Sequence, residues 1–395
     1  MIERTEYLEK LKSFRDKDLI KVITGIRRCG KSTLFDIFID YLLKNGVKKE
    51  QIIKVNLENP ELELPTHKDL YNYVKEQLPK GKKAYVFLDE VQQVPEFQRA
   101  VDGLYLNKDI DLYITGSNAM LLSGELATLL SGRYIEIKML PLSYKEYLSA
   151  TEEDTNEYSY RNYTNRSSFP YAVSLETEDE TDEYLQNIYN TVIIKDVMQR
   201  RNFSDTNTLN MIAKFMFDNI GNLLSVKKIA DTMTSDGRKI STHTVGNYLS
   251  ALTESFIFHK ATRYDIRGKQ YLQSGEKYYA TDVALRYALL GRKNVDAGRI
   301  LENVVYLELI RRGYKVFVGK NDTKEVDFVA ENKDGTLYVQ VAYTVRDEKT
   351  LAKELSALQS IPDHYPKLLL TMDVDPIADF DGVKKINVLD WLIEK

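Results

Sequence analysis

The sequence has few of the residues that build disulfide or zinc frameworks. It contains one cysteine and four histidines in 395 residues. A single cysteine forms no intrachain disulfide, and these few ligands do not favour a structural zinc site. No apolar run reaches the length that crosses a membrane, and the first ten residues lack the apolar core of a signal peptide. We therefore expect a cytoplasmic protein.

Positive charge is not in excess either. Lys and Arg number 55 against 59 Asp and Glu, which gives a formal net charge of -4. This balance argues against a chain coated with basic charge but leaves local basic patches open. The length and a hydrophobic content of 43% predict two or three globular domains with full-sized cores.

One short run carries a specific chemical signal. The residues GIRRCGKST, from Gly25 to Thr33, fit the G-x-x-x-x-G-K-[ST] loop that surrounds nucleotide phosphates. A buried strand precedes this loop and a helix over 31–46 follows it, which is the context that the motif requires. Lys31 is expected to meet the β- and γ-phosphates, and the Ser32 hydroxyl to take one position on Mg²⁺. We predict that ATP and Mg²⁺ bind to a loop lined by Gly25, Arg28, Cys29, Gly30, Lys31, Ser32 and Thr33.

Two carboxylates follow the next strongly apolar strand, YVFLDE. Asp89 is suited to hold Mg²⁺ through water, and Glu90 to polarise an attacking water. The alternative is a pair of charges that merely ends a strand. A kinase has no need of the second carboxylate, so Glu90 favours hydrolysis of the nucleotide.

Two further side chains complete the candidate catalytic set. The strand LYITGSN ends near Ser117 and Asn118, and Ser117 is a candidate for sensing the γ-phosphate. An ordinary helix N-cap is the alternative for either residue. Arg133 is a candidate for stabilising transition-state charge, in cis or across a subunit interface, and the alternative is a surface arginine.

The chain divides by pattern into four regions. Residues 1–150 alternate strands and helices, which predicts an α/β fold built on the parallel sheet of a P-loop NTPase. Residues 151–183 are strongly acidic and predict a solvated connector. Three short helices and a hairpin over 184–290 have the order of a winged helix-turn-helix. Residues 291–395 return to mixed helix and strand.

The motifs together resemble a known family, the AAA-type P-loop ATPases of the additional-strand catalytic-glutamate class that carry a C-terminal domain of unknown function 4143. The resemblance extends over nearly the whole chain and rests on GIRRCGKST, FLDEVQ, ITGSNA, SGRYIEIKMLPLSYKEYL, SFPYAV, YLQNIYNTVIIKDVMQR, TRYDIRGKQYL, EKYYATDVALRYALLG, ILENVVYLELIRRGYKVFVG, EVDFVA and YVQVAYTV. It implies an ATPase core, a winged-helix segment and a restriction-endonuclease-like α/β domain. One departure is Ile26, which stands where the family commonly has proline.

The C-terminal region lacks part of a nuclease site. Such a site needs an acidic residue on its second strand, which Asp327 supplies, and an acid-x-Lys on its third. The third strand has Gln340 and Ala342 at those two positions, so only Glu302 and Asp327 remain as acids. Lys324 is a candidate replacement for the missing lysine. We expect a domain without cleavage chemistry.

The predicted winged helix has a local surplus of positive charge. Between residues 205 and 275 there are nine Lys and Arg against six acids. In the predicted recognition helix STHTVGNYLSAL, Thr242, His243 and Asn247 are candidates for contact with base edges. In the predicted wing RYDIRGKQ, the phosphate contacts are assigned to Arg263, Arg267 and Lys269. Double-stranded DNA is the favoured partner, and a packing or protein-binding module is the alternative.

Three functions fit these features to different degrees. The first is a Mg²⁺-dependent ATPase that acts as a molecular switch on DNA. The second is a nucleotide-binding scaffold for a protein partner, with little turnover. The third, a P-loop kinase, is disfavoured because no segment predicts a lid. The sequence leaves open the biological process, the partner and the oligomeric state, with a homo-oligomer as one alternative.

Overall fold

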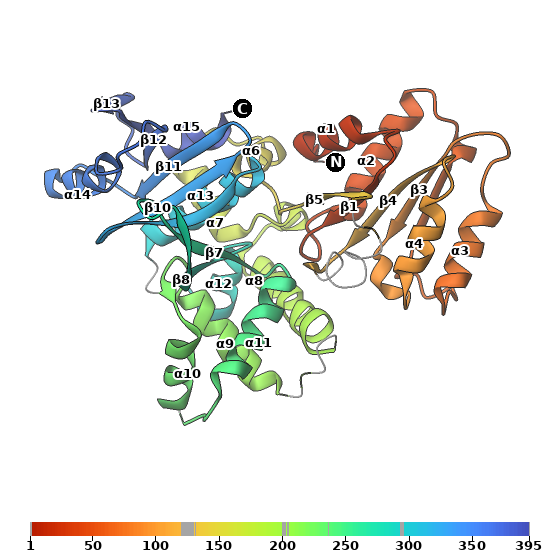
Figure 1. Ribbon diagram of the computed structural model, residues 1–395, viewed down its shortest axis with the longest axis horizontal. Helices are drawn as coiled ribbons and strands as arrows, with labels where there is room; N and C mark the ends of the chain where they lie inside the picture. Colours follow the sequence, from red (N-terminus) through yellow and green to blue (C-terminus); the bar gives the residue numbers. More distant parts are fainter. Residues whose placement is uncertain are drawn as a thin grey trace. The chain divides into compact units, whose positions relative to one another are not determined.

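The computed structural model describes residues 2–119, 130, 132–199, 203, 205–235, 237–292 and 296–394. The chain forms two compact units, residues 1–141 with 254–256 and residues 142–253 with 257–395. Each unit is built around its own β-sheet (Figure 1). None of the helices in the described ranges combines the length and apolarity needed to cross a membrane.

The first unit alternates strands with helices around a parallel sheet. Its strands are β1 (Ile20–Thr24), β2 (Ile52–Asn56), β3 (Ala84–Asp89), β4 (Ile110–Gly116) and β5 (Tyr134–Lys138). Its helices are α1 (Thr5–Phe14), α2 (Lys31–Lys44), α3 (His67–Glu76) and α4 (Phe97–Tyr105), with short turns η1 (Lys49–Gln51) and η2 (Val91–Gln93). The strand order is β2-β3-β4-β1-β5, and all neighbours run parallel. The predicted α/β class is therefore confirmed.

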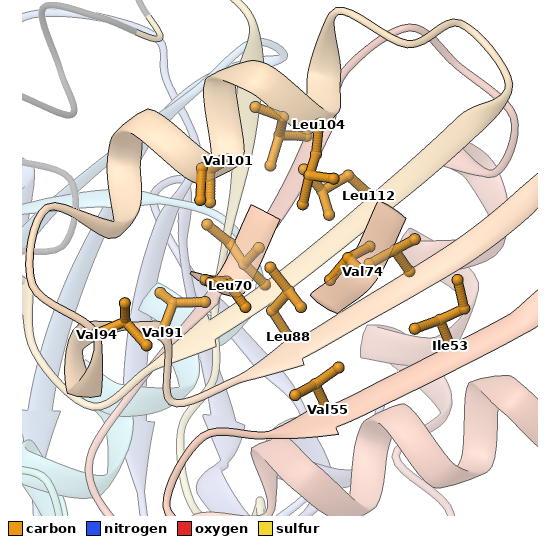
Figure 2. Packing of buried hydrophobic residues seen from close by; sticks show 14 of the residues in the cluster. Ile53, Val55, Leu70, Val74, Leu88, Val91, Val94, Val101, Leu104 and Leu112 are labelled. Atoms are coloured by element: carbon orange, nitrogen blue, oxygen red, sulfur yellow. The ribbon is translucent and has the colours of Figure 1, made fainter. Parts of the chain in front are cut away.

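The sheet of the first unit is buried on both faces. Every residue of β1 and β3 is buried, as expected for parallel strands that helices cover on each side. On one face, aliphatic residues of β2, β3 and β4 pack against α3 and α4 (Figure 2). On the other face, Phe87 of β3 and Tyr113 of β4 pack against Phe35 and Phe38 of α2. The period of two along β3 sends its side chains to these two layers in turn.

The second unit begins with helices. They are α6 (Tyr144–Thr151), α7 (Glu157–Arg166), the 3₁₀ turn η4 (Pro170–Ser174), α8 (Glu178–Thr191), the π-helical η5 (Val192–Gln199), α9 (Thr206–Asp218), α10 (Val226–Ser235) and α11 (Thr242–Glu254). After the hairpin described below come α12 (Ala284–Leu290), α13 (Ala297–Arg311), α14 (Glu348–Gln359) and α15 (Val388–Ile393).

One nine-stranded sheet runs through the second unit. Its strands are β6 (Leu223–Leu224), β7 (Phe258–Asp265), β8 (Gln270–Ala280), β9 (Lys315–Asn321), β10 (Lys324–Asn332), β11 (Gly335–Ala342), β12 (Lys367–Thr371), β13 (Ala378–Phe380) and β14 (Val383–Asn387). Their order is β13-β14-β12-β11-β10-β9-β7-β8-β6. The parallel pair of β7 with β9 joins the hairpin to the C-terminal strands. The predicted division at 290/291 thus falls within a continuous sheet, and the four-part division stays a prediction.

The acidic stretch over 151–183 differs from the predicted solvated connector. It contains α7, η4 and the start of α8, each with a defined N-terminus. Tyr160 and Tyr163 of α7 are buried, and the Tyr163 hydroxyl donates to the Leu142 carbonyl at 3.0 Å. The acids lie mainly at exposed positions, where they cost little, while the tyrosines between them pack inward. The net charge of the whole stretch therefore gives no indication of the apolar side of α7.

Candidate nucleotide-binding site

The phosphate loop joins β1 to α2, as the motif predicts. Gly30 caps α2 with a φ of 104°, which favours glycine. A Cβ added at Gly25 would lie 2.2 Å from the Met139 carbonyl oxygen, so only glycine fits there. Ser32 and Thr33 are exposed in the first turn of α2, where backbone N–H groups and the helix dipole favour an anion.

The Lys31 ammonium lies between the loop and the ends of two strands. Its Nζ donates to the carbonyls of Gly25 at 3.0 Å and Ile26 at 3.2 Å, and to the Ser117 Oγ at 2.9 Å. The same Nζ lies 3.4 Å from the Glu90 Oε1. Three segments, the phosphate loop and the residues after β3 and β4, therefore meet around the one buried cation that begins α2.

The two predicted carboxylates are held by a shared hydroxyl. Thr115, near the end of β4, donates from its Oγ1 to the Asp89 carboxylate and accepts from the Glu90 N–H at 2.9 Å. Glu90 has a φ of 56°, a left-handed conformation that costs a non-glycine residue roughly 1–3 kcal/mol. Strain of this kind is retained where surrounding contacts fix the residue, as Thr115 does here.

The Glu90 carboxylate is charged and well oriented. Its Oε1 accepts from the Ser117 Oγ at 2.5 Å, and its Oε2 accepts from the Gln92 amide. Burial alone would raise the pKa of Glu90, but the Lys31 ammonium and these hydrogen bonds hold it below its usual range. The residue is therefore an ionised acceptor at neutral pH, as a group that orients water requires.

The sequence interpretation missed two residues of this site. Gln92, in DEVQ, holds Glu90, but no spacing rule singles it out. Arg4 is buried beneath the loop and donates to the carbonyls of Cys29 at 2.9 Å and Leu140 at 2.6 Å. A lone arginine so far from the motif in sequence gives no signal until the fold is known. Arg4 is a positioning residue for the back of the phosphate loop.

The loop's other predicted lining residues fall into two groups. Arg28 is exposed, with a φ of 65°, and its contact with a nucleotide stays a prediction. Cys29 is fully buried, and this burial raises the pKa of its thiol. The Cys29 side chain therefore supports the loop from within, and only its backbone is available to a phosphate.

Arg133 is not brought to the other candidate catalytic residues. It precedes β5, and its carbonyl accepts from the N–H of Ile20, the first residue of β1. The phosphate loop follows the other end of β1, roughly 13 Å away for a strand of this length. The guanidinium instead pairs with Asp102 of α4 at 2.7 Å. This placement does not favour a role in cis, and a role across a subunit interface stays a prediction.

The donor set fits a nucleotide-bound Mg²⁺ better than a free metal centre. With the side chains as they stand in the described residues, no cluster of three or more His, Cys, Asp or Glu is arranged to hold a metal ion. The phosphate-loop type of site supplies one hydroxyl and one nearby carboxylate, and phosphate oxygens and water complete the six ligands. Ser32 and Asp89 are the groups of this kind at the carboxyl edge of the sheet. Which residues hold Mg²⁺ stays a prediction.

The C-terminal candidates lie together, with one exception. Asp327 of β10 accepts from the Val341 N–H at 2.9 Å, and Gln340 of β11 donates to Glu354 at 2.7 Å. Lys324 instead reaches the Ser356 carbonyl at 2.9 Å, in an exposed position. It therefore makes its contact away from Asp327.

Family comparisons agree with this geometry. An AAA domain matches residues 17–148, which include the phosphate loop, β3 and β4. A domain of unknown function (DUF8612) matches residues 157–296, so the C-terminal domain bears a different name from the domain of unknown function 4143 that the resemblance implied. Residues 17–148 thus form an AAA domain built on a phosphate loop.

Two relatives match over nearly full length. An uncharacterized protein of Haemophilus influenzae is 41% identical over 400 residues, covering 100% of this chain and 99% of that protein. The chain belongs to the same family as this protein. The uncharacterized protein MJ1544 of Methanocaldococcus jannaschii is 29% identical over 395 residues, 94% of this chain and 85% of that protein. Among solved structures, the Walker-type ATPase PABY2304 of Pyrococcus abyssi is 15% identical, with a TM-score of 0.48, over 73% of this chain and 96% of that chain.

Proposed function

We propose that the protein is a Mg²⁺-dependent ATPase. The observation that carries this proposal is the convergence of Lys31, Glu90 and Ser117 around one buried position at the carboxyl edge of a parallel sheet. In a P-loop ATPase such a lysine contacts the β- and γ-phosphates, and a charged carboxylate orients the attacking water. The Ser117 hydroxyl, which contacts both charged groups, links the two and is the proposed sensor of the γ-phosphate.

Steady-state ATP hydrolysis with Mg²⁺ tests this proposal. We expect turnover in the unmodified protein and its loss in Lys31→Ala, because the ammonium that contacts the phosphates is removed. Lys44→Ala is a matched control, because Lys44 is exposed at the far end of the same helix. Nucleotide binding without turnover in the unmodified protein would favour the alternative of a scaffold for a protein partner.

We further propose that the second unit contacts duplex DNA. The order α9, β6, α10, α11, β7, β8, with β6 and β7 both paired to β8, supports a winged helix. Thr242, His243 and Asn247 are exposed on α11, as base-contacting side chains need to be. This face is the one that we propose for the major groove.

Two of the three residues predicted for the wing are engaged within the protein, and the third, Lys269, is exposed. Arg267 pairs with Asp322 at 2.7 Å, and the Arg263 side chain packs where a Cβ on Gly275 would lie. By contrast Lys227 and Lys228 on α10 and Arg238 before α11 are exposed. Because an existing ion pair has to be broken before its cation contacts a phosphate, the proposed backbone contacts are those of α10 together with Lys269 of the wing.

Replacing Lys227 and Lys228 together by Ala should weaken duplex binding. Loss of two phosphate contacts should lower the slope of log affinity against log salt by about two. Fluorescence anisotropy with a labelled duplex, from low to moderate salt, measures both quantities. The control is Lys48→Ala with Lys49→Ala, two exposed adjacent lysines of the first unit. An unchanged salt slope in the Lys227, Lys228 variant would contradict the proposed contact.

Stimulation of ATP hydrolysis by duplex DNA would support both proposals together and indicate a molecular switch that acts on DNA. In that case the Lys227, Lys228 variant should retain basal hydrolysis and lose the stimulation. A hydrolysis rate that DNA does not change would support the ATPase proposal alone and would favour a protein partner over DNA. The two parts of the proposed function therefore succeed or fail separately.

A further inference from the structure

A buried lysine lies in the middle of the carboxylate cluster of the second unit. Lys277 of β8 points its Nζ to within 2.9 Å of the Glu302 Oε1 on α13 and 2.8 Å of the Glu325 Oε1 on β10. The Asp327 Oδ1 is 3.8 Å away. The side chain of Lys277 is only 5% exposed, so its ammonium is surrounded by protein. One cation thus contacts three carboxylates from two different elements.

The surrounding contacts hold these groups in place. The Tyr279 hydroxyl donates to the same Glu302 oxygen at 2.7 Å, and its ring stacks on Tyr306 with 4.1 Å between centroids. The second oxygen of Asp327 accepts from the Val341 N–H. Glu302 and Asp327 therefore each accept a hydrogen bond in addition to their contact with the Lys277 ammonium. A buried ion pair is tolerated when such additional hydrogen bonds are present.

The position of the ammonium is incompatible with a metal at the same carboxylates. Mg²⁺ lies at about 2.0–2.1 Å from its oxygen ligands and prefers six of them. An ammonium already within hydrogen-bonding distance of two of the carboxylates repels a second cation there. Gln340 is neutral, its Oε1 already accepts from the Asp327 N–H at 3.2 Å, and its amide donates to Glu354, so it supplies no charge for a metal. The residues present do not fit the divalent cation that a restriction-endonuclease-like core implies.

The Lys277 ammonium also stabilises the charged form of Asp327. Burial and the Glu302 carboxylate raise the pKa of Asp327 to about 8, whereas Lys277 acts to lower it. The one ammonium of the cluster thus opposes the effects of burial and of the neighbouring carboxylate on Asp327.

We infer that the Lys277 ammonium is the permanent cation of the Glu302, Glu325 and Asp327 cluster, so that this cluster takes no divalent metal unless Lys277 is removed. Lys277 lies on the hairpin of the predicted winged helix, while the carboxylates belong to the predicted nuclease-like core. The same ammonium thus joins the two predicted modules. This inference does not depend on ATP hydrolysis.

Removing the ammonium tests the inference. Lys277→Met keeps most of the side-chain volume and leaves three carboxylates without their cation. We expect this variant to bind about one Mn²⁺ per chain at the cluster, where an oxygen-rich site suits the ion. Adding Asp327→Asn should weaken that binding about tenfold or more, since even the neighbours of metal ligands cost that much when lost. Electron paramagnetic resonance of free Mn²⁺, with the full-length chain and no nucleotide, measures the binding.

Thermal unfolding gives a second readout. Mn²⁺ should raise the Tm of Lys277→Met by several degrees and leave that of the unmodified protein unchanged, because a ligand stabilises only the fold that binds it. Lys260→Met is the matched control. Lys260 lies on the neighbouring strand β7 and pairs with one carboxylate, that of Glu276, at 3.1 Å. It should acquire no Mn²⁺ site.

Three outcomes would overturn the inference. The first is a folded Lys277→Met that binds no Mn²⁺ at the cluster. The second is Mn²⁺ binding by the unmodified protein that Asp327→Asn removes. The third applies if Lys277→Met fails to fold even with Mn²⁺. In that case the Mn²⁺ binding isotherm of the unmodified chain is compared with that of its Glu302→Gln variant. A difference between the two isotherms would show that the cluster binds metal and would contradict the inference.

Discussion

Replacing Glu90 by Gln should lower the rate of ATP hydrolysis by about 100- to 10,000-fold, the usual contribution of a positioned general base. The substitution keeps the shape of the side chain and one acceptor oxygen, so it can keep one of the two hydrogen bonds that Glu90 accepts from Ser117 and Gln92. It removes the negative charge that lies 3.4 Å from the Lys31 ammonium. ATP binding should therefore persist or become tighter, because Lys31 loses a competing carboxylate while its own charge remains.

The two effects are separated by measuring turnover and nucleotide affinity on the same preparation. Single-turnover hydrolysis reports the chemical step, and equilibrium titration with a fluorescent ATP analogue reports binding. Glu96→Gln is the control, because Glu96 is also an acid just after β3, but is about half exposed and pairs with His67. A Glu90→Gln variant that hydrolyses ATP at the normal rate would refute the proposed role of Glu90. Loss of binding in parallel with turnover would show a structural role instead.

The parts of the first unit that the sequence predicted are those decided by local pattern. Four apolar residues before Asp89 require burial on both faces, and a glycine-rich loop between a strand and a helix has few alternative conformations. The strand predicted over 84–90 is β3, Ala84–Asp89, and the helix predicted over 31–46 is α2, Lys31–Lys44. Because parallel strands end at a common edge, the meeting of Lys31, Glu90 and Ser117 followed from these elements.

The features that escaped prediction depend on pairing between distant segments. Arg133 lies at the amino edge of the sheet because β5 pairs with β1 in a register that aligns Tyr134 with Ile20. Lys277 reaches Glu302 and Asp327 because β7 joins the hairpin to β9 in one sheet. Lys324, the replacement lysine predicted from the sequence, lies on β10 like Asp327 but contacts the Ser356 carbonyl. No local spacing indicates that the cation comes from the hairpin.

Phe87 should be among the most costly positions of the first unit to truncate. Its side chain is fully buried, stacks on Tyr113 at 4.8 Å and meets the edge of Phe35 at 5.1 Å. Phe87→Ala leaves a cavity between β3 and α2 that backbone on a parallel sheet cannot close, so about 3–5 kcal/mol of unfolding free energy should be lost. Because α2 carries Lys31 and Ser32 at its first turn, looser packing should weaken ATP binding as well.

Denaturant unfolding with and without ATP and Mg²⁺ measures both consequences. The chain has two compact units, so the transition of the first unit is identified as the one that nucleotide shifts. Phe97→Ala is the comparison, since Phe97 is only partly buried at the start of α4, and it should cost clearly less. If Phe87→Ala cost no more than Phe97→Ala, the aromatic layer would not be what fixes α2 to the sheet. Phe87→Ala could instead lose the expected unfolding free energy and keep its ATP affinity. That result would mean that the phosphate loop is positioned by Arg4 and its carbonyl contacts rather than by the packing of α2.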